Sequence, residues 1–242
     1  MEWHSRYTQQ ATWTRDLRAY LFDKAGLSQA RRVLEVGCGT GAVLRELKTS
    51  ATLHGLDLDP AALSECRIHA PHATLTRGNG LFLPYLEQTF DIVYCHYFLL
   101  WVGDPLQAVL EMKRVTREQG HILALAEPDY SHRIDKPDEL IQLGKWQTAS
   151  LIKQGADPGF GSRLAESFFQ AGINIRETGT IQSVNSEPSA EEREMEWTVI
   201  ESDLAGEVSD AEILKMKMLD EQAWMRGERV LQVPTYFAWG QV

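Results

Sequence analysis

The 242-residue sequence has few cysteines and no long apolar run. Its three cysteines, Cys38, Cys66 and Cys95, are odd in number and far apart, which fits neither a disulfide framework nor a zinc knuckle. No stretch of about 18 apolar residues occurs, and the first residues lack a basic start followed by an apolar core. We therefore expect a cytoplasmic protein with reduced thiols and without a membrane segment, a secretion signal or a bound metal.

The sequence also lacks an excess of positive charge. Its 24 Lys and Arg residues stand against 34 Asp and Glu residues, so the formal net charge is −10. A protein that binds nucleic acid through phosphate contacts needs the opposite sign, so nucleic acid is not expected as a partner. The hydrophobic (43%) and charged (24%) fractions are typical of a globular fold, and no internal repeat or low-complexity tract is present.

Strand and helix patterns alternate along the first half of the chain. Short apolar segments predict strands at 32–36, 52–57, 73–78, 90–99 and 121–128. Helical spacing of apolar residues predicts helices at 6–26 with Gly26 as cap, at 41–50, from Pro60 after an Asp59 cap, and at 104–120 with Gly120 as stop. This alternation predicts an open, mostly parallel sheet with helices on both faces, and ligands then bind at the carboxyl ends of the strands.

The second half of the chain predicts a different mixture of elements. We expect helices at 137–155 and 162–172, a strand within 173–184, helices opened by capping boxes at Ser189 and Ser209, and a last strand within 227–242 with Pro234 at a bulge or edge. Without a linker-like tract, residues 1–242 are interpreted as a single domain. Its predicted parts are an N-terminal helical lid (1–28), a cofactor-binding core (30–128), a helical substrate insert (129–172) and C-terminal strands and helices (173–242).

The stretch VLEVGCGTGAV, residues 33–43, contains three glycines in five positions. Gly37, Gly39 and Ala42 match the dinucleotide fingerprint G-x-G-x-x-[GA], and Asp57 stands 20 residues after Gly37, where a ribose-binding acid is expected. A strand, a tight turn with outward-pointing amides and a helix N-terminus would suit a phosphate or a carboxylate. The motif alone leaves a dinucleotide, a phosphate and a sulfonium cofactor open.

A wider set of segments makes the interpretation more specific. E-x-G-C-G-T-G at 35–41 is followed in order by GLDLDP at 55–60, RGNGLFLP at 77–84, FDIVYCHYFLLWVGDP at 90–105 and REQGHILALAEPDY at 117–130. Together these segments resemble the class I S-adenosylmethionine-dependent methyltransferases, in particular the branch with the ubiquinone and menaquinone biosynthesis enzymes. The resemblance implies a Rossmann-like seven-stranded, mostly parallel α/β sheet, an antiparallel last strand, and S-adenosylmethionine as the cofactor.

The resemblance also implies cofactor contacts, each with a capping or packing role as its alternative. The turn from Gly37 to Gly41, with Gly39 and Thr40, would approach the methionine part, and Glu35 would accept hydrogen bonds from its amino group. Asp57 would take the two ribose hydroxyls. The remaining contacts would be Leu58 on the adenine face, Asn79 on the adenine amine in place of the family's usual Asp, Gly80 and Leu81 in the adenine pocket, and His96 near the sulfonium.

Methyl transfer places modest demands on protein groups, because the sulfonium carries its own leaving group. Alignment of an acceptor lone pair with the S–CH₃ axis can supply up to about 7–11 kcal/mol. An oxygen or nitrogen acceptor can still need a base, and His96 and Glu127 are the catalytic candidates. Glu127 and Asp129 are equally placed to bind an amine-bearing substrate or to cap the helical insert.

The leading helix and the insert are expected to select a small-molecule acceptor. Tyr7, Gln10 and Trp13 would form an aromatic-rich lid, although each can equally be ordinary core. The sequence lacks any Pro-Pro pair, hence also the D/N-P-P-Y/F run of enzymes that methylate amino groups of nucleic acid bases. Two alternatives stay open: an NAD(P)-dependent oxidoreductase, which would use the same glycine fingerprint, and a non-catalytic cofactor-binding scaffold. The sequence sets no oligomeric state.

Overall fold

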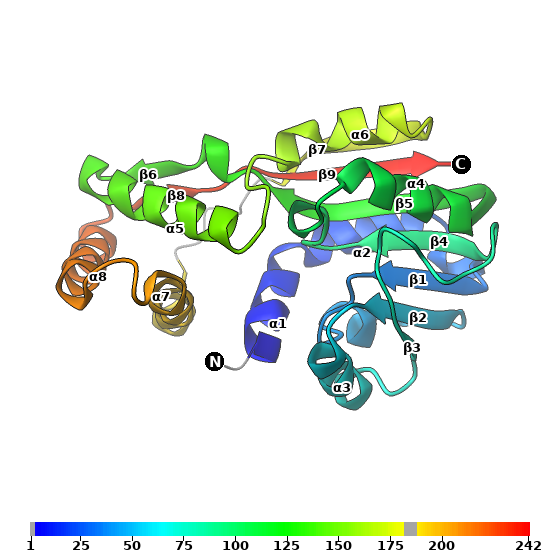
Figure 1. Ribbon diagram of the computed structural model, residues 1–242, viewed down its shortest axis with the longest axis horizontal. Helices are drawn as coiled ribbons and strands as arrows, with labels where there is room; N and C mark the ends of the chain where they lie inside the picture. Colours follow the sequence, from blue (N-terminus) through cyan, green and yellow to red (C-terminus); the bar gives the residue numbers. More distant parts are fainter. Residues whose placement is uncertain (1–2, 182–187) are drawn as a thin grey trace.

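The structure is a computed structural model that describes residues 3–181 and 188–242. Its centre is a seven-stranded sheet with the order β3-β2-β1-β4-β5-β9-β7 (Figure 1). These strands are β1 (Arg32–Val36), β2 (Thr52–Asp57), β3 (Thr74–Arg77), β4 (Phe90–Cys95), β5 (Thr116–Pro128), β7 (Asn174–Ile181) and β9 (Thr235–Gln241). Strands β1 to β5 pair in parallel, whereas β9 is antiparallel to both β5 and β7. The predicted mostly parallel sheet with an antiparallel last strand is confirmed.

Helices cover both faces of this sheet, as predicted. The helices of the described residues are α1 (Trp3–Trp13), α2 (Arg15–Lys24), α3 (Pro60–His69), α4 (Pro105–Val115), α5 (Ile141–Lys153), α6 (Leu164–Gln170), α7 (Ala190–Leu204) and α8 (Asp210–Met225). On β4, Val93 and Cys95 join the core beneath α4 and α6, while Ile92 and Tyr94 join the core beneath α2 and α3. The two-residue side-chain period of a strand thus builds two apolar layers from one buried segment.

A smaller assembly lies to one side of the large sheet (Figure 1). Strands β6 (Ile134–Lys136) and β8 (Val230–Gln232) pair there as a separate two-stranded sheet. Helices α5, α7 and α8 surround a third apolar cluster that includes Leu143, Trp197 and Ile200. The predicted helical insert therefore packs with the C-terminal helices, while α1 lies between this assembly and the large sheet (Figure 1).

Buried charged side chains connect the parts of this lateral assembly. Arg229, on the loop before β8, donates to Asp135 on β6 (2.9 Å) and to Asp220 on α8 (2.5 Å). Arg133 donates to Asp135 at 2.7 Å, and the Trp197 indole donates to Asp220 at 3.0 Å. All five side chains are nearly inaccessible to water, so β6, α7, α8 and β8 are joined by a fully paired polar network.

The helix predicted at 41–50 is wrong. Only a short 3-10 helix, Leu44–Glu46, is present between β1 and β2. Residues 40–44 are all buried, whereas a helix lying on a sheet buries residues three and four apart and exposes those between them. The continuous burial of this segment requires an irregular connection, and the glycine turn therefore has no helix N-terminus behind it.

Three predicted boundaries also differ. The leading helix breaks at Thr14 into α1 and α2, although Gly26 does adopt the predicted left-handed cap conformation (φ 72°). Helix α4 ends at Val115, and Gly120 lies inside β5, because Thr116 already pairs with β4. The last strand is divided at Pro234, which has no N–H to donate, into β8 and β9.

Several predicted local features are confirmed. The Asp59 carboxylate caps α3 by accepting from the Ala61 amide at 2.8 Å. Ser189 and Glu192 form a complete capping box, and the Ser209 side chain accepts from the Glu212 amide. The predicted strand within 173–184 is β7, and its positions 182–184 lie outside the described residues. No helix in the described ranges is long and apolar enough to cross a membrane.

Candidate functional site

The predicted cofactor residues meet at the carboxyl edge of the large sheet. The glycine turn follows β1, Asp57 ends β2, Asn79 follows β3, and His96 follows β4. The parallel pairing of β1 with β2 and β4 places the ends of these strands side by side. This edge is where open α/β sheets bind their ligands.

The glycine turn directs its amides into the protein. The Gly37 and Cys38 amides donate to the Leu56 carbonyl (2.8 and 3.0 Å), the Gly41 amide donates to the Cys38 carbonyl (2.8 Å), and the Gly39 amide donates to Asp57 Oδ2 (2.7 Å). The expectation of outward-pointing amides is therefore wrong. Three of these amides fasten the turn to β2 and the Gly41 amide closes the turn on itself, so these four amides form no anion-binding nest.

Asp57 is held in place while keeping acceptor capacity. Its Oδ2 accepts from the Gly39 amide, and its Oδ1 accepts from the Asp59 amide at 2.9 Å. Each carboxylate oxygen has a further lone pair, so both can still receive a hydroxyl hydrogen. Beside it, Leu58 is 63% exposed and offers an apolar surface at the same edge.

Asn79, Gly80 and Leu81, which were predicted to lie beside the adenine, follow β3 at this edge. Asn79 is exposed, and its Oδ1 accepts from the Leu81 amide at 2.9 Å, which occupies part of its acceptor capacity. The side-chain NH₂ group of Asn79 is therefore as available to a ligand as its side-chain oxygen. Gly80 is buried and Leu81 half-buried behind it.

Phe98 is a site residue that the sequence did not reveal. A Cβ atom at Gly37 would lie 2.4 Å from Phe98 Cδ2, and one at Gly80 would lie 2.6 Å from Phe98 Cζ. The ring thus packs against both the glycine turn and the loop after β3, and each glycine is needed for that close approach. The role of Phe98 follows from its contact with both Gly37 and Gly80, which are far apart in the sequence. No pattern in the sequence could therefore have identified it.

Glu35 is buried (2% exposed) at the end of β1. Tyr94 donates to its Oε2 at 3.0 Å, and within the described residues no donor reaches its Oε1. Burial raises the pKa of Glu35 well above its usual value, and the Tyr94 hydrogen bond and the Arg18 charge oppose this effect. An unpartnered carboxyl oxygen at this edge is the group that an amino group of a ligand would use.

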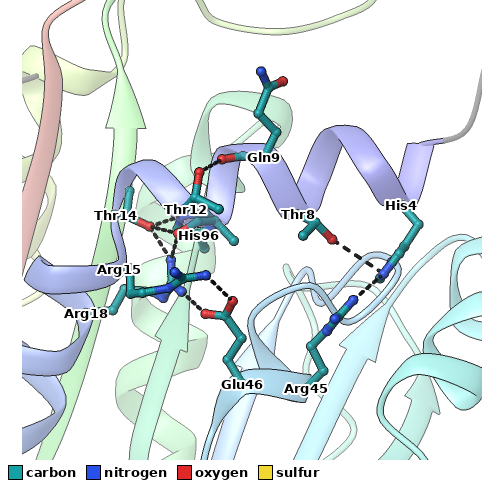
Figure 2. Close-up of polar contacts among 11 residues, drawn as sticks. His4, Thr8, Gln9, Thr12, Thr14, Arg15, Arg18, Arg45, Glu46 and His96 are labelled. Atoms are coloured by element: carbon teal, nitrogen blue, oxygen red, sulfur yellow. Dashed lines mark hydrogen bonds and ion pairs between the residues drawn. The ribbon is translucent and has the colours of Figure 1, made fainter. Parts of the chain in front are cut away.

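Helix α1 covers the glycine turn. The Tyr7 ring lies 3.4 Å from the position of a Gly39 Cβ, and His4 Nδ1 lies 2.9 Å from Thr40 Oγ1. His4 also lies between Thr8 and Arg45 (Figure 2). Of the predicted substrate residues, Tyr7 is therefore next to the cofactor loop.

The other predicted lid residues lie farther along α1. Trp13 is 48% exposed beneath the Arg6 guanidinium, which is 5.3 Å from its ring centre, and Gln10 is half-buried. Arg6 pairs with Glu196 of α7 at 2.6 Å. Helix α1 is therefore attached to the cofactor edge on one side and to the lateral assembly on the other.

His96 is half-buried and is contacted by the junction between α1 and α2. Thr14 Oγ1 lies 2.9 Å from His96 Nε2 (Figure 2). The Tyr97 ring packs edge-on against the imidazole. Burial and the nearby Arg18 charge lower the pKa of His96 to about 3. The imidazole is therefore neutral at physiological pH.

Glu127 is fully buried and serves the loop after β4. Its Oε1 accepts from the Phe98 and Leu99 amides (3.1 and 3.0 Å), and its Oε2 accepts from the Leu100 amide (3.2 Å). Burial raises the pKa of Glu127 to about 7, and the three amides oppose the rise. Its contacts are those of an anchor for the loop that carries His96 and Phe98.

Asp129 is likewise buried and engaged in local hydrogen bonds. It accepts from the Ser131 amide (2.9 Å), from His132 Nδ1 (3.0 Å) and from the Ser162 amide (3.3 Å). Burial raises its pKa, but hydrogen bonds from Ser131, Ser162 and His132 outweigh that effect and lower the value to about 2. Asp129 thus joins the end of β5 to the start of α6. These contacts correspond to the alternative in which Asp129 caps the helical insert and does not bind a substrate.

The Glu127 carboxyl should make stability depend on pH. Its folded pKa of about 7 exceeds the usual 4.5, so the contribution to stability is fully present below about pH 4.5 and is lost as pH rises to 7. The lost contribution amounts to about 3 kcal/mol. Urea unfolding of wild type and Glu127→Gln should show a difference in unfolding free energy that changes between pH 4.5 and 7 and is constant above. A difference independent of pH would contradict this assignment.

Comparison with known proteins identifies the segment that builds this edge. Residues 34–124 match the family model described as a methyltransferase domain. This segment is a methyltransferase domain. The match confirms the resemblance to class I S-adenosylmethionine-dependent methyltransferases, and the methyltransferase domain contains the glycine turn, Asp57, Asn79 and His96.

Named relatives share this methyltransferase domain. The chain is 31% identical over 138 residues to the malonyl-acyl-carrier-protein O-methyltransferase of Halorhodospira halophila, covering 53% of this chain and 47% of the relative. It is 30% identical over 115 residues to the ubiquinone biosynthesis O-methyltransferase of Vibrio campbellii, covering 43% and 46%. The aligned part of the chain thus spans about half the length of these curated relatives.

A solved structure shares the fold over a longer region. The geranyl diphosphate C-methyltransferase of Streptomyces coelicolor, solved with S-adenosyl-L-homocysteine, matches 94% of this chain and 77% of its own. The TM-score is 0.59 and the sequence identity 12%, so this likeness concerns the fold. The predicted Rossmann-like architecture therefore extends beyond the methyltransferase domain itself.

Proposed function

We propose that this chain is an S-adenosylmethionine-dependent methyltransferase that transfers a methyl group to a small-molecule acceptor by in-line displacement. The observation that carries the proposal is the pairing of Asp57 with a glycine turn in which the amides of all three glycines and of Cys38 have acceptors within the protein. Asp57 suits a ribose, and the turn admits an uncharged or zwitterionic chain at close range. This combination fits a nucleoside joined to an amino-acid tail.

The residues present fit such a cofactor group by group. Asp57 would receive the ribose hydroxyls on its two remaining lone pairs, and Leu58 would pack on the adenine. Glu35 Oε1, which has no donor among the described residues, would accept from the amino group. The bound cofactor supplies an activated methyl on a sulfonium, while α1, with Tyr7 over Gly39, limits the access of water.

The turn argues against the nicotinamide alternative. A dinucleotide places its pyrophosphate on free amides at a helix N-terminus. Here the amides of Gly37, Cys38, Gly39 and Gly41 already have acceptors, and a short 3-10 helix follows in place of a longer helix. A non-catalytic scaffold would bind the same cofactor without transferring its methyl group. A screen of methyl acceptors with labelled S-adenosylmethionine therefore separates the scaffold from the enzyme.

Relatives suggest a range of acceptors without selecting one. Their names refer to malonyl-acyl-carrier protein, ubiquinone biosynthesis and trans-aconitate. We propose a small organic acceptor, consistent with the acidic net charge of −10. Helix α1 and the lateral assembly would select it, with Tyr7 and Trp13 as candidate contacts.

Asp57→Ala should weaken binding of S-adenosyl-L-homocysteine by about 100-fold or more, because two hydrogen bonds to a charged group are lost. Isothermal titration calorimetry measures the affinity directly. Asp59→Ala is the matched control: Asp59 is the neighbouring carboxylate, it caps α3, and its loss should cost stability with little change in affinity. Equal affinities of wild type and Asp57→Ala would contradict the ribose role.

A further inference from the structure

His96 stands at the end of a shielded chain of polar contacts that begins at Arg18 (Figure 2). Arg18 Nη1 donates to Thr14 Oγ1 and to the Ala11 carbonyl, while Arg18 Nη2 pairs with Glu46. Thr14 Oγ1 in turn lies 2.9 Å from His96 Nε2. Thr14 and Arg18 are 1% and 4% exposed, so water does not compete for these contacts.

The direction of the Thr14–His96 hydrogen bond follows from counting donors. Arg18 can only donate, so it occupies a lone pair of Thr14 Oγ1. The Ala11 carbonyl is also within reach of the Thr14 hydroxyl as an acceptor, at 3.3 Å, but it already receives Arg18 Nη1 and the Thr14 amide. The contact with His96 Nε2 is shorter, at 2.9 Å, which favours Nε2 as the acceptor of the single Thr14 proton. Nε2 then carries the lone pair, and the ring proton is on Nδ1.

We propose that Thr14 and Arg18 are positioning residues that hold His96 as the neutral Nδ1–H tautomer, so that His96 donates a hydrogen bond at the site and does not act as a base. The groups that face His96 are Thr14 at the α1–α2 junction, Arg18 on α2 and the neighbouring Tyr97. The Arg18 charge opposes a second proton on the ring. Burial raises the pKa of Tyr97, which stays uncharged.

His96 Nδ1 is the nitrogen left for a ligand. No hydrogen bond to it is found within residues 3–181 and 188–242, and the side chain is only half-buried. His96 directly follows β4 at the carboxyl edge, beside the strand that ends in the glycine turn. An N–H at this place can orient an acceptor or an oxygen of the cofactor.

This assignment, which rests on the proposed function, narrows the class of acceptor. The other candidate base, Glu127, is fully buried and receives three backbone amides. With neither group available to take a proton, the acceptor must be a good nucleophile without losing a proton, as a carboxylate or a neutral amine is. An alcohol would first need to lose its proton.

The bonds balance without a protein base. The acceptor lone pair forms the new bond to the methyl carbon, and the S–C bond breaks with its electron pair returning to sulfur. A carboxylate becomes a neutral ester with no proton to lose. A neutral amine becomes an ammonium, which releases its proton to water after transfer.

Long-range ¹H–¹⁵N correlation spectra of the full chain test the tautomer, with and without S-adenosyl-L-homocysteine. His96→Gln assigns the signal. We expect the Nδ1–H pattern, unchanged from about pH 5 to about pH 9. Thr14→Ser should preserve it, and Thr14→Val should shift it toward the Nε2–H form. An Nε2–H pattern in wild type, or one that titrates near pH 6.5, would overturn the proposal.

The ligand-free spectra keep this test separate from the proposed function. Failure of S-adenosyl-L-homocysteine to bind would reject the function, whereas the tautomer is read from the protein alone. Labelled S-adenosylmethionine with a panel of carboxylic acids, amines and alcohols supplies the second arm. Esters or N-methyl products support the acceptor class. Methyl ethers of alcohols, formed more slowly by His96→Gln than by wild type, would overturn it.

Discussion

Gly37→Ala should abolish measurable binding of S-adenosyl-L-homocysteine and lower the unfolding free energy by about 2–4 kcal/mol. Gly37 has φ 73°, which costs an alanine about 1–2 kcal/mol. Its Cβ would also lie 2.4 Å from the Phe98 ring, which packs against both the glycine turn and the loop after β3. Displacement of this ring would deform the turn and the 79–80 loop together. Calorimetry and urea unfolding measure the two effects.

Two other glycines separate the causes. Gly26 has φ 72° with nothing near its Cβ position, so Gly26→Ala should cost only the backbone term and leave affinity unchanged. Gly80 lacks a positive φ, but its Cβ would lie 2.6 Å from the same Phe98 ring. Gly80→Ala should therefore reproduce the loss of binding through the overlap. If Gly37→Ala behaves like Gly26→Ala, Phe98 does not connect the two loops.

Arg229→Leu should lower the unfolding free energy by about 3–5 kcal/mol, because it leaves two buried carboxylates short of their partner. Arg229 bonds Asp135 on β6 and Asp220 on α8, and all three side chains are almost fully buried. Loss of the cation would separate β6, β8 and α8 at their common junction. Urea unfolding followed by circular dichroism measures the change.

A neighbouring ion pair supplies the control. Lys136 and Asp138 are 2.6 Å apart, but their side chains are 55% and 72% exposed. Water and salt screen such a pair, so Asp138→Ala should cost less than about 1 kcal/mol. Similar losses for Arg229→Leu and Asp138→Ala would show that the buried network contributes no more than a surface pair.

The sheet was predictable because local signals and burial agree along β1 to β5. The strand at 90–95 is buried on both faces, as a central parallel strand is, and Asp59 with Pro60 marks the start of α3 as N-cap and first helical residue. Glu35 and Asp57 could be placed at strand ends from spacing alone. The resemblance to methyltransferases then assigned them to a ligand.

The rest depends on tertiary contacts that leave no local pattern. The segment at 41–50 has helical spacing, but residues 40–44 are buried in succession, and packing overrides propensity there. Glu127 and Phe98 are 29 residues apart, and their hydrogen bond exists only because β4 and β5 are neighbours. The same holds for Thr14 and His96, which are separated by 82 residues.

Calorimetric titration of the full chain with S-adenosylmethionine, S-adenosyl-L-homocysteine and NAD tests the central claim most directly. The account predicts that the two sulfur nucleosides bind once per chain and that NAD does not compete with them. The reason is that Asp57 serves a ribose while the amides of Gly37, Cys38, Gly39 and Gly41 are occupied. Binding of NAD at this site, or no binding of either sulfur nucleoside, would contradict it.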